Sequence, residues 1–475
     1  MPTSANNVPH FGAPHPTVEE RIAHGKAARK AVPRRAHAQW SEGQRTHDPV
    51  ALLQQQADTR VPDLVPIRHG RMSASPFANY RGAALMMAAD LATVPDSGLT
   101  VQLCGDAHLS NFGGFASPER KLVFDLNDFD ETLPGPFEWD VKRLVASIEV
   151  AARSNGFDDA TRADMVLAAG RSYREAMAQF SIMRDLEVWY SSIDVESTLA
   201  AIQDQADAAQ RKRTKKGLAK AHNKNQLRAA AKLTTVVDGQ LRFLDDPPLL
   251  VSAGKLFGTE LGQDLERAVR GSLDSYHESL NEDRRHLLDR YQFVDLARKV
   301  VGVGSVGTRA WIALFVGRDD DDPLVLQVKE AQASVLEQFL PASKYPTHGQ
   351  RVVEGQRLMQ AASDIMLGWQ QTDGIDGIRR DYFMRQLWDW KASVEVDLLA
   401  PPMLARYGEL CAWTLARAHA RSGDRIAISA YLGTSGGFDQ AMAEFAAKYA
   451  DQNDRDHATL LAAIADGRLE AETGI

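Results

Sequence analysis

The sequence predicts an α+β protein with a mainly helical part and a smaller antiparallel β-sheet. Apolar residues recur at helical spacing in long stretches such as "FEWDVKRLVASIEVAARSNG" and "LARYGELCAWTLARAHARSG". The stretch "RYQFVDLARKVVGVGSVGTRAWIALFVGRDDDDPLVLQVKEA" instead reads as strands, with a glycine loop and an acidic turn between the apolar runs. A chain of 475 residues is long enough for two or three structural units.

Composition excludes several classes of protein. The formal charge of −8 speaks against a general nucleic-acid coat. Cys104 and Cys411, the two cysteines, cannot form a disulfide framework or a four-thiolate zinc site, and both lie in apolar contexts typical of buried thiols. The first residues contain no apolar signal-peptide core, and the sequence has no apolar run long enough to span a membrane. We therefore expect a cytoplasmic protein.

The elements are expected in the following order. A loose Pro- and Asn-rich arm of about fifteen residues precedes a helix at "TVEERIAHGKAARKAV". One further helix is expected over "SPFANYRGAALMMAADLATVPDSG", capped by Ser75 and closed by Pro95 and Gly98. Two short strands, "LTVQLC" and "KLVFDLND", come next, followed by helices at "FEWDVKRLVASIEVAARSNG" and "DDATRADMVLAAGRSYREAMAQF".

The character of the chain changes between Ser192 and Pro248. This stretch is charged and poor in large apolar residues, and it contains the basic run "QRKRTKKGLAKAHNK", expected to be a solvated surface. Helices return at "GQRVVEGQRLMQAAS" and near the C-terminus, with a strand at "DYFMRQLWDW" between them. The predicted units are an N-terminal arm and helices (1–100), a loop-bearing half (101–191), a charged helical insertion and connector (192–290), a β-lobe (291–395) and C-terminal helices (396–475).

A first group of polar residues follows the strand "LTVQLC", in the loop "GDAHLSN". Asp106 in such a loop can accept a proton from a substrate hydroxyl, and the amide oxygen of Asn111 can bind magnesium. The next strand ends in "FDLNDFDE", which offers Asp125, Asp128 and Asp130. Because magnesium needs few protein carboxylates when phosphate oxygens complete its shell, one of these and Asn111 would suffice.

A second group lies in the β-rich stretch. The loop "GVGSVGT" contains Gly302, Gly304, Ser305, Gly307 and Thr308, and glycines there let the backbone approach phosphates closely. It is neither a Walker loop nor a dinucleotide fingerprint, because a strand follows it instead of a helix. Lys329 ends the later strand "LVLQVK", where a lysine can bind nucleotide phosphates, and Glu354 on the next helix is its expected ion-pair partner.

The motif "GDAHLSN … NDFDETLPGPFEWD" resembles the catalytic half of aminoglycoside and choline kinases, which belong to the protein-kinase-like superfamily. The resemblance implies a two-lobed kinase-like fold, ATP and Mg²⁺ as cofactors, Asp106 as catalytic base and Asn111 as metal ligand. The first His of the family motif is replaced by Cys104. The family interval favours Asp128 as the metal Asp, with Asp125 as the alternate, and makes Asp140 a structural carboxylate behind the loop.

The order of the two groups is reversed relative to kinases, because the catalytic half precedes the glycine loop and lysine. We therefore expect a circular permutation, in which Lys329 and Asp128 face one cleft despite a separation of 201 residues. The chain also resembles a bacterial family of unknown function, DUF2252, in phrases such as "VQLCGDAHLSNFG", "RKVVGVGSVGTR" and "ARAHARSGD". That family label carries no reaction with it.

The expected function is ATP- and Mg-dependent phosphoryl transfer to an unknown hydroxyl acceptor, either a small molecule or a protein side chain. His108, Asp130 and Arg81 are further candidates for the cleft, and His419 is expected to be buried. Three alternatives remain: nucleotidyl (AMP) transfer on the same fold, a metal-dependent phosphoesterase using Asp106 and His108, and a non-catalytic nucleotide-binding scaffold. A nucleic-acid partner is not expected, because the basic run lacks interleaved aromatic residues.

Overall fold

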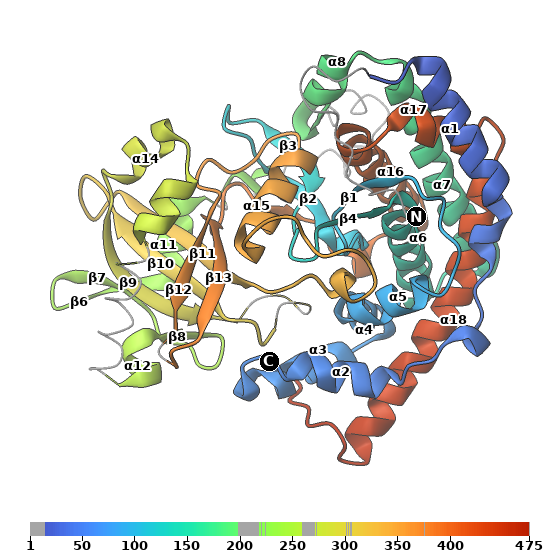
Figure 1. The fold of residues 1–475 in the computed structure, drawn as a ribbon. Helices are drawn as coiled ribbons and strands as arrows, with labels where there is room; N and C mark the ends of the chain where they lie inside the picture. Colours follow the sequence, from blue (N-terminus) through green and yellow to red (C-terminus); the bar gives the residue numbers. More distant parts are fainter. Residues whose placement is uncertain are drawn as a thin grey trace.

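The computed structural model describes residues 15–197, 218–219, 221–223, 225–258, 271, 273–300, 302, 304, 306–374 and 376–474. Figure 1 shows a β-rich part beside a larger, mainly helical part. The predicted α+β class is confirmed. Ser305 and the basic run around Arg211 lie outside the described residues. Within the described residues, none of the helices is both long enough and apolar enough to cross a bilayer.

The β-rich part is an antiparallel sheet of six strands in the order β12-β13-β11-β10-β9-β8. Its strands are β8 (Leu250–Ser252), β9 (Gln292–Lys299), β10 (Ala310–Val316), β11 (Pro323–Ala331), β12 (Gly368–Asp373) and β13 (Arg379–Gln386). The glycine loop joins β9 to β10, and the acidic turn joins β10 to β11, both as predicted. The register places Lys329 of β11 between Ala310 of β10 and Phe383 of β13. Helices α14 (Glu282–Leu288) and α15 (His348–Met359) lie in the connections of this part.

The helical part is built on long helices that share one apolar core. They are α1 (Val18–Ala31), α6 (Phe137–Ser154), α7 (Asp159–Ile182), α16 (Pro401–Ser422), α17 (Arg425–Leu432) and α18 (Gly437–Ala465), with the short α8 (Asp185–Tyr190) after α7. Helix α1 begins at a capping box in which Thr17 and Glu20 satisfy each other's backbone N–H groups. Helix α6 is buried almost throughout, because α7, α16 and α18 pack around it.

The N-terminal helices α2 (Pro49–Ala57), α3 (Val65–Ser73), α4 (Pro76–Gly82) and α5 (Ala84–Leu91) cover one end of the helical part. Ser75 caps α4 as predicted, accepting a hydrogen bond of 3.1 Å from the Ala78 N–H. The single helix expected after Ser75 is in fact two helices with a break at Ala83. Gly82 lies directly against Met72 of α3, so the chain turns where this close packing ends.

Two small sheets carry the polar loops of the first group. β1 (Thr100–Leu103) pairs with β4 (Leu133–Pro136). β2 (Phe112–Ala116) and β3 (Leu122–Leu126) form a second sheet, flanked by β14 (Ala392–Ser393) and β5 (Ile193–Asp194). The loop after β1 lies beside the end of β3, because Asn111 at the end of that loop forms hydrogen bonds with the backbone of Asn127 and Asp128.

The end of α16 lies beside the start of β1, although the two are far apart in the sequence. The Gln102 N–H donates to Ser422 Oγ over 3.2 Å. Gly423 is packed so closely on Thr100 and Val101 that a side chain there would clash with both. In space, the chain could therefore pass from α16 into β1 with a short connection.

The predicted helical insertion at 192–290 needs correction. Its described residues include helices α11 (Gln226–Leu233) and α12 (Ala253–Phe257), but also a hairpin of β6 (Thr234–Val237) and β7 (Gln240–Phe243). The signal for this hairpin was Asp238-Gly239, both with positive φ, which is the preferred pair for a tight hairpin turn. β8 then joins the six-stranded sheet, so the segment supplies an edge of the β-rich part.

Candidate active site

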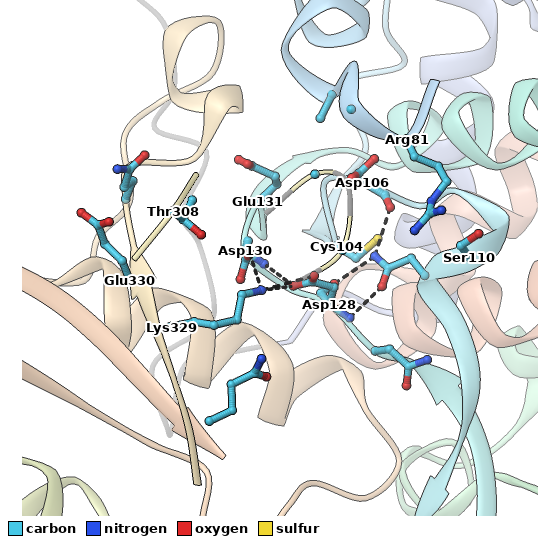
Figure 2. Close-up of a pocket in the computed structure, with 18 of the residues that line it drawn as sticks. Arg81, Cys104, Asp106, Ser110, Asp128, Asp130, Glu131, Thr308, Lys329 and Glu330 are labelled. Atoms are coloured by element: carbon cyan, nitrogen blue, oxygen red, sulfur yellow. Dashed lines mark hydrogen bonds and ion pairs between the residues drawn. The ribbon is translucent and has the colours of Figure 1, made fainter. Parts of the chain in front are cut away.

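A cleft of about 1430 Å³ separates the β-rich part from the helical part. Its walls include the loop after β1, the end of β3, β11, the glycine loop and residues of α3 and α4. Members of both predicted groups therefore line one cavity, Asp106, Asn111, Asp128 and Asp130 from the first and Gly302, Gly304, Thr308 and Lys329 from the second. Figure 2 shows Asp106, Asp128, Asp130, Thr308 and Lys329 around it.

The loop after β1 is held from behind by Asp140 of α6. One carboxylate oxygen of Asp140 accepts the Cys104 N–H over 2.8 Å, and the other accepts the Gly105 N–H over 3.0 Å. Gly105 has φ +84°, and a Cβ there would meet the Glu131 backbone, so the turn requires glycine. His419 is fully buried, with Nε2 at 3.2 Å from Asp140 and Nδ1 at 2.8 Å from the Tyr173 hydroxyl. The structural role predicted for Asp140 is confirmed.

Asp106 projects from this loop into the cleft and is oriented by Arg143. The buried Arg143 guanidinium donates one hydrogen bond of 2.8 Å, from Nε, to one oxygen of Asp106, and its Nη2 forms an ion pair with the same oxygen at 2.8 Å. The second oxygen lies 3.6 Å from His108 Nε2. Burial lowers the pKa of His108 to about 4, with Asp106 opposing and Arg143 reinforcing the shift, so the imidazole is neutral at physiological pH.

Asn111 connects the loop to the residue after β3. Its Nδ2 donates to the backbone oxygens of Asp106 and Asp128, each over 3.0 Å. Its Oδ1 accepts the Asp128 N–H over 2.7 Å. An amide oxygen has two acceptor sites, so Oδ1 keeps one for a cation. Asn111 thereby fixes the spacing between Asp106 and Asp128.

Lys329 reaches across the cleft from β11 to the carboxylates that follow β3. Its Nζ lies 3.4 Å from both oxygens of Asp128 and 2.6 Å from Asp130 Oδ2. The Lys329 side chain is only 3% exposed, whereas the Asp128 side chain is 41% exposed. The predicted approach of Lys329 and Asp128, 201 residues apart, is confirmed.

These charges set the protonation of the group. Burial by itself raises the pKa of Asp128, but Lys329 and Arg385 outweigh it, so that pKa lies well below its ordinary value. Burial and the neighbouring Asp128 raise the pKa of Asp130. Burial lowers the pKa of Lys329, but the two carboxylates outweigh it and raise it overall. Asp128 and Lys329 are therefore both charged at neutral pH.

A protein-family model described as an uncharacterized protein conserved in bacteria (DUF2252) matches residues 60–463. The chain belongs to the DUF2252 family. This confirms the family resemblance that the sequence suggested. Searches of curated proteins and of solved structures returned no match.

Asp125, the alternate metal residue, lies outside the cleft of this DUF2252 chain. It is fully buried and pairs with Arg417 of α16 over 2.5 Å, and it also accepts the N–H groups of Leu126 and Ala361. Its two oxygens are thus occupied by protein donors. Asp128, by contrast, lines the cavity, as do Asp130 and Glu131 beyond it.

The predicted ion pair between Lys329 and Glu354 is wrong. Glu354 lies on the partly exposed face of α15 and pairs with Arg357 over 3.1 Å. The buried face of α15 carries Arg351, which donates to the backbone oxygens of Asp130, Thr132 and Gln332. The face of α15 that packs toward the strand bearing Lys329 therefore carries an arginine and not a glutamate.

The glycine loop of the DUF2252 chain lines the cleft through Gly302, Gly304 and Thr308. Gly307 has φ +90°, and its carbonyl oxygen accepts the Val61 N–H over 2.7 Å. The Arg60 guanidinium donates to the Val306 oxygen. The N-terminal segment thus holds the C-terminal side of the loop.

Several cleft residues were missed at the sequence level. Arg385 of β13 donates to the Asn127 oxygen over 2.8 Å and faces the cavity with Gln327. The alternation of side chains along a strand could have identified Arg385, because Phe383 and Arg385 share the sheet face that carries Lys329. Arg68 and Arg71 of α3 also line the cavity. No sequence pattern marks them, because only packing brings α3 to this wall.

The donor set fits a magnesium ion bound with phosphate. A half-exposed aspartate (Asp128) and an amide oxygen (Asn111) both line the cleft, and the amide oxygen accepts the Asp128 N–H. Across the described segments, no group of three or more His, Cys, Asp or Glu side chains is arranged to hold a metal. Magnesium in nucleotide sites needs only one or two protein carboxylates, with phosphates and waters completing its shell.

Proposed function

We propose that this chain transfers a phosphoryl group from Mg·ATP to a hydroxyl acceptor. The observation that carries the proposal is the convergence of Lys329, Asp128, Asn111 and Asp106 on one cleft. Phosphoryl transfer needs a cation for the phosphates, ligands for magnesium and a base for the acceptor hydroxyl. These four side chains are of the types that would supply all three, and Figure 2 shows Lys329, Asp128 and Asp106 among them.

Each residue has one role in this proposal. Lys329 would bind nucleotide phosphates, and Asp128 with Asn111 would hold magnesium, which offsets the charge of the transferred group. Asp106 would accept the proton of the attacking hydroxyl. Arg143 keeps the Asp106 carboxylate in a single orientation, which is the positioning that this reaction depends on.

The arrangement of the sheet supports a kinase-like lobe. A glycine loop joins two neighbouring strands, and a lysine on the third strand faces the same cleft. That is the order of parts in protein kinases, where a glycine-rich loop covers the phosphates and the lysine lies on the third strand. The adjacency of Ser422 to Gln102 supports a circular permutation, because it is the junction at which an unpermuted chain would continue.

The missing Lys–Glu pair distinguishes this site from that of a protein kinase. Lys329 is held instead by Asp128 and Asp130. Lys329 would exchange its contacts with Asp128 for phosphate oxygens when a nucleotide enters, while Asp130 would continue to orient it. The chain can therefore position its lysine without a glutamate on α15.

The phosphoesterase alternative, with Asp106 and His108 as metal ligands, is disfavoured by Arg143. Its guanidinium contacts Asp106 at 2.8 Å and would repel a cation bound there. Nucleotidyl transfer uses the same binding groups as phosphoryl transfer. The two differ in which phosphorus atom is attacked, so product analysis separates them.

The first experiment compares thermal unfolding of the wild type, Lys329→Ala and Asp128→Asn, with and without Mg·ATP. ATP at about one hundred times its dissociation constant stabilises the folded state by about 2.7 kcal/mol. We expect a magnesium-dependent rise in midpoint for the wild type and none for the two variants. Asp321→Asn, in the exposed acidic turn, and Glu354→Gln are matched controls that should keep the rise.

Two results decide the proposal. No shift of the wild type at millimolar Mg·ATP would overturn the nucleotide site. If the shift occurs, incubation with ATP labelled at the γ- or the α-phosphate and a panel of hydroxyl acceptors follows. Label transferred from the γ-phosphate supports phosphoryl transfer, and label transferred from the α-phosphate replaces it with nucleotidyl transfer.

A further inference from the structure

One wall of the cleft is basic, and it lies on the N-terminal helices and the end of β9. We name it the basic wall and define it as Arg68 and Arg71 of α3, Arg81 of α4, and Lys299 of β9. All four residues line the cavity that contains Asp106 and Lys329. None of them belongs to the lysine and magnesium groups described above.

Within the basic wall, Arg71 is close enough to Arg81 and to Lys299 for their positive charges to repel. Burial lowers the pKa of Arg81, and Arg71 lowers it further. Burial likewise lowers the pKa of Lys299, with Lys232 and Arg71 adding to the effect. Arg71 therefore interacts with the charges of both Arg81 and Lys299. The repulsion among like charges that face one cavity is offset when an anion binds in that cavity.

Arg68 adds a positive charge beneath this wall. It is 1% exposed, and one of its nitrogens donates to Gln56 Oε1 and to the Gly82 oxygen, each over 2.9 Å. Its Nε and Nη1 have no hydrogen-bond partner among the described residues. An arginine remains protonated even when buried, so its charge reaches the cavity with little screening.

Arg81 is the member of the wall closest to the proposed chemistry. Figure 2 shows its guanidinium beside Asp106, at the edge of the cleft away from Lys329. A Cβ placed on Gly302 would lie 4.0 Å from Arg81 Nη2, so the same guanidinium also approaches the glycine loop. Among the described residues, Arg81 forms no ion pair, and its Nε has no hydrogen-bond partner. The carboxylates that face it are Asp106 and Asp397.

From this placement, we infer that the acceptor substrate carries a phosphate group in addition to the hydroxyl that is attacked. The basic wall would bind that phosphate, and Arg81 would contact it directly while the hydroxyl points at Asp106. Several cations in one patch match the two charges of a phosphate ester better than the single charge of a carboxylate. The inference rests on the proposed function, because it names the acceptor of that reaction.

The test uses the full-length chain saturated with Mg²⁺ and the ATP analogue AMP-PNP, which occupies the position of the transferred phosphate. Inorganic phosphate is then titrated by calorimetry, with acetate as the comparison anion. We expect phosphate to bind the loaded protein at least tenfold more tightly than acetate. Arg81→Gln and Lys299→Gln should each weaken phosphate binding at least tenfold and leave AMP-PNP binding within a factor of three.

Two controls accompany the titration. Arg228→Gln removes a positive charge from an exposed position on α11, outside the cleft, and should leave phosphate binding unchanged. Lys329→Ala should fail to bind AMP-PNP. When phosphate is titrated into this variant without AMP-PNP, it should still bind at the basic wall. Because the Arg81 Nε has no hydrogen-bond partner among the described residues, replacement of Arg81 should leave the fold intact, which circular dichroism checks.

Each remaining outcome has one meaning. Competition between phosphate and AMP-PNP would assign the wall to the nucleotide and overturn the inference. Phosphate binding that Arg81→Gln and Lys299→Gln leave unchanged would also overturn it, as would equal affinity for acetate. Failure of AMP-PNP to bind, with wall-dependent phosphate binding intact, would overturn the phosphotransferase proposal and leave an anion site supported.

Discussion

Asp125 and Asp128 lie three residues apart at the end of the same strand, yet their surroundings are opposite. Asp125 is fully buried, with Arg417 at 2.5 Å and two backbone N–H donors on its oxygens. Asp128 is 41% exposed, faces the cavity, and has Lys329 at the longer distance of 3.4 Å. The first carboxylate is saturated by protein donors and the second is open to a ligand.

This difference teaches how one short segment serves two purposes. The pair of Asp125 and Arg417 ties β3 to α16 from within the core. That anchor lets the chain continue into the cleft and present Asp128 at a defined place, with Asn111 fixing its backbone. Asp128 depends on the buried Asp125–Arg417 pair and on Asn111 for its position, because an open carboxylate contributes little to folding by itself.

The largest expected effect comes from breaking the buried pair. Arg417→Met should lower the free energy of unfolding by about 3–5 kcal/mol, because it leaves Asp125 charged and buried without a counter-ion. Asp128→Asn should change it by less than about 1 kcal/mol, since Lys329 keeps Asp130. Urea denaturation measures both. Equal losses in the two variants would contradict the contrast between a saturated and an open carboxylate.

A second saturated carboxylate gives the next effect. Asp140→Asn should cost about 1.5–3 kcal/mol, because an amide can accept only through its oxygen and loses the charge that strengthens the bonds from the Cys104 and Gly105 N–H groups. Amide hydrogen exchange of these two N–H groups should accelerate in the variant. Unchanged exchange would mean that the loop is held by other contacts. Asp321→Asn is the surface control.

The pH dependence of stability sharpens the comparison on the cleft side. Burial lowers the pKa of His108 from 6.5 to about 4, so below pH 6.5 the unfolded chain takes up a proton that the folded chain does not. Above pH 6.5 the imidazole is neutral in both states and does not affect stability. As the pH falls from 6.5 toward 4, protonation of His108 favours the unfolded chain, and the folded state loses stability. Between pH 7.5 and pH 5, the wild type should lose about 2 kcal/mol more stability than His108→Gln. Parallel pH profiles of the two proteins would refute the assignment.

The smallest expected effect concerns the cap of the helix that carries Arg81. Ser75→Ala should destabilise the protein by about 1 kcal/mol, because the Ala78 N–H loses its acceptor. Ser75→Asp, which can also cap, should recover most of the loss. Thermal or urea unfolding measures both. A greater loss in Ser75→Asp than in Ser75→Ala would show that the site cannot accept a carboxylate.

Much of the local structure was predictable from the sequence. The apolar run before Cys104 and the polar residues after it predicted the strand and loop, and "DDDD" before Pro323 predicted the turn between two strands. The break at Ala83 had no comparable signal, because it depends on how α4 packs against α3. The hairpin at Asp238-Gly239 did have a signal, which the high charge of the surrounding segment obscured.

The candidate site was only partly predictable. The sequence pointed to Asp106, Asn111, Asp128 and Lys329 by residue type and spacing, and the structure brings them into one cleft. It did not predict that Glu354 would face away from Lys329, since helical periodicity gives the faces of α15 but not which face meets the cleft. Arg81 was a candidate for the cleft, but the basic wall as a group was not predicted, because its members come from α3, α4 and β9.

The sequence by itself determined the strands, the caps, the glycine loop and the order of the polar motifs, because backbone preference and hydrophobic periodicity act over a few neighbouring residues. Only the tertiary structure decided that Asp125 is buried and Asp128 open, and that Lys329 meets a carboxylate 201 positions away. Those outcomes depend on which helices and strands pack together. Contacts of this kind are set by the burial of whole faces, which local sequence does not specify.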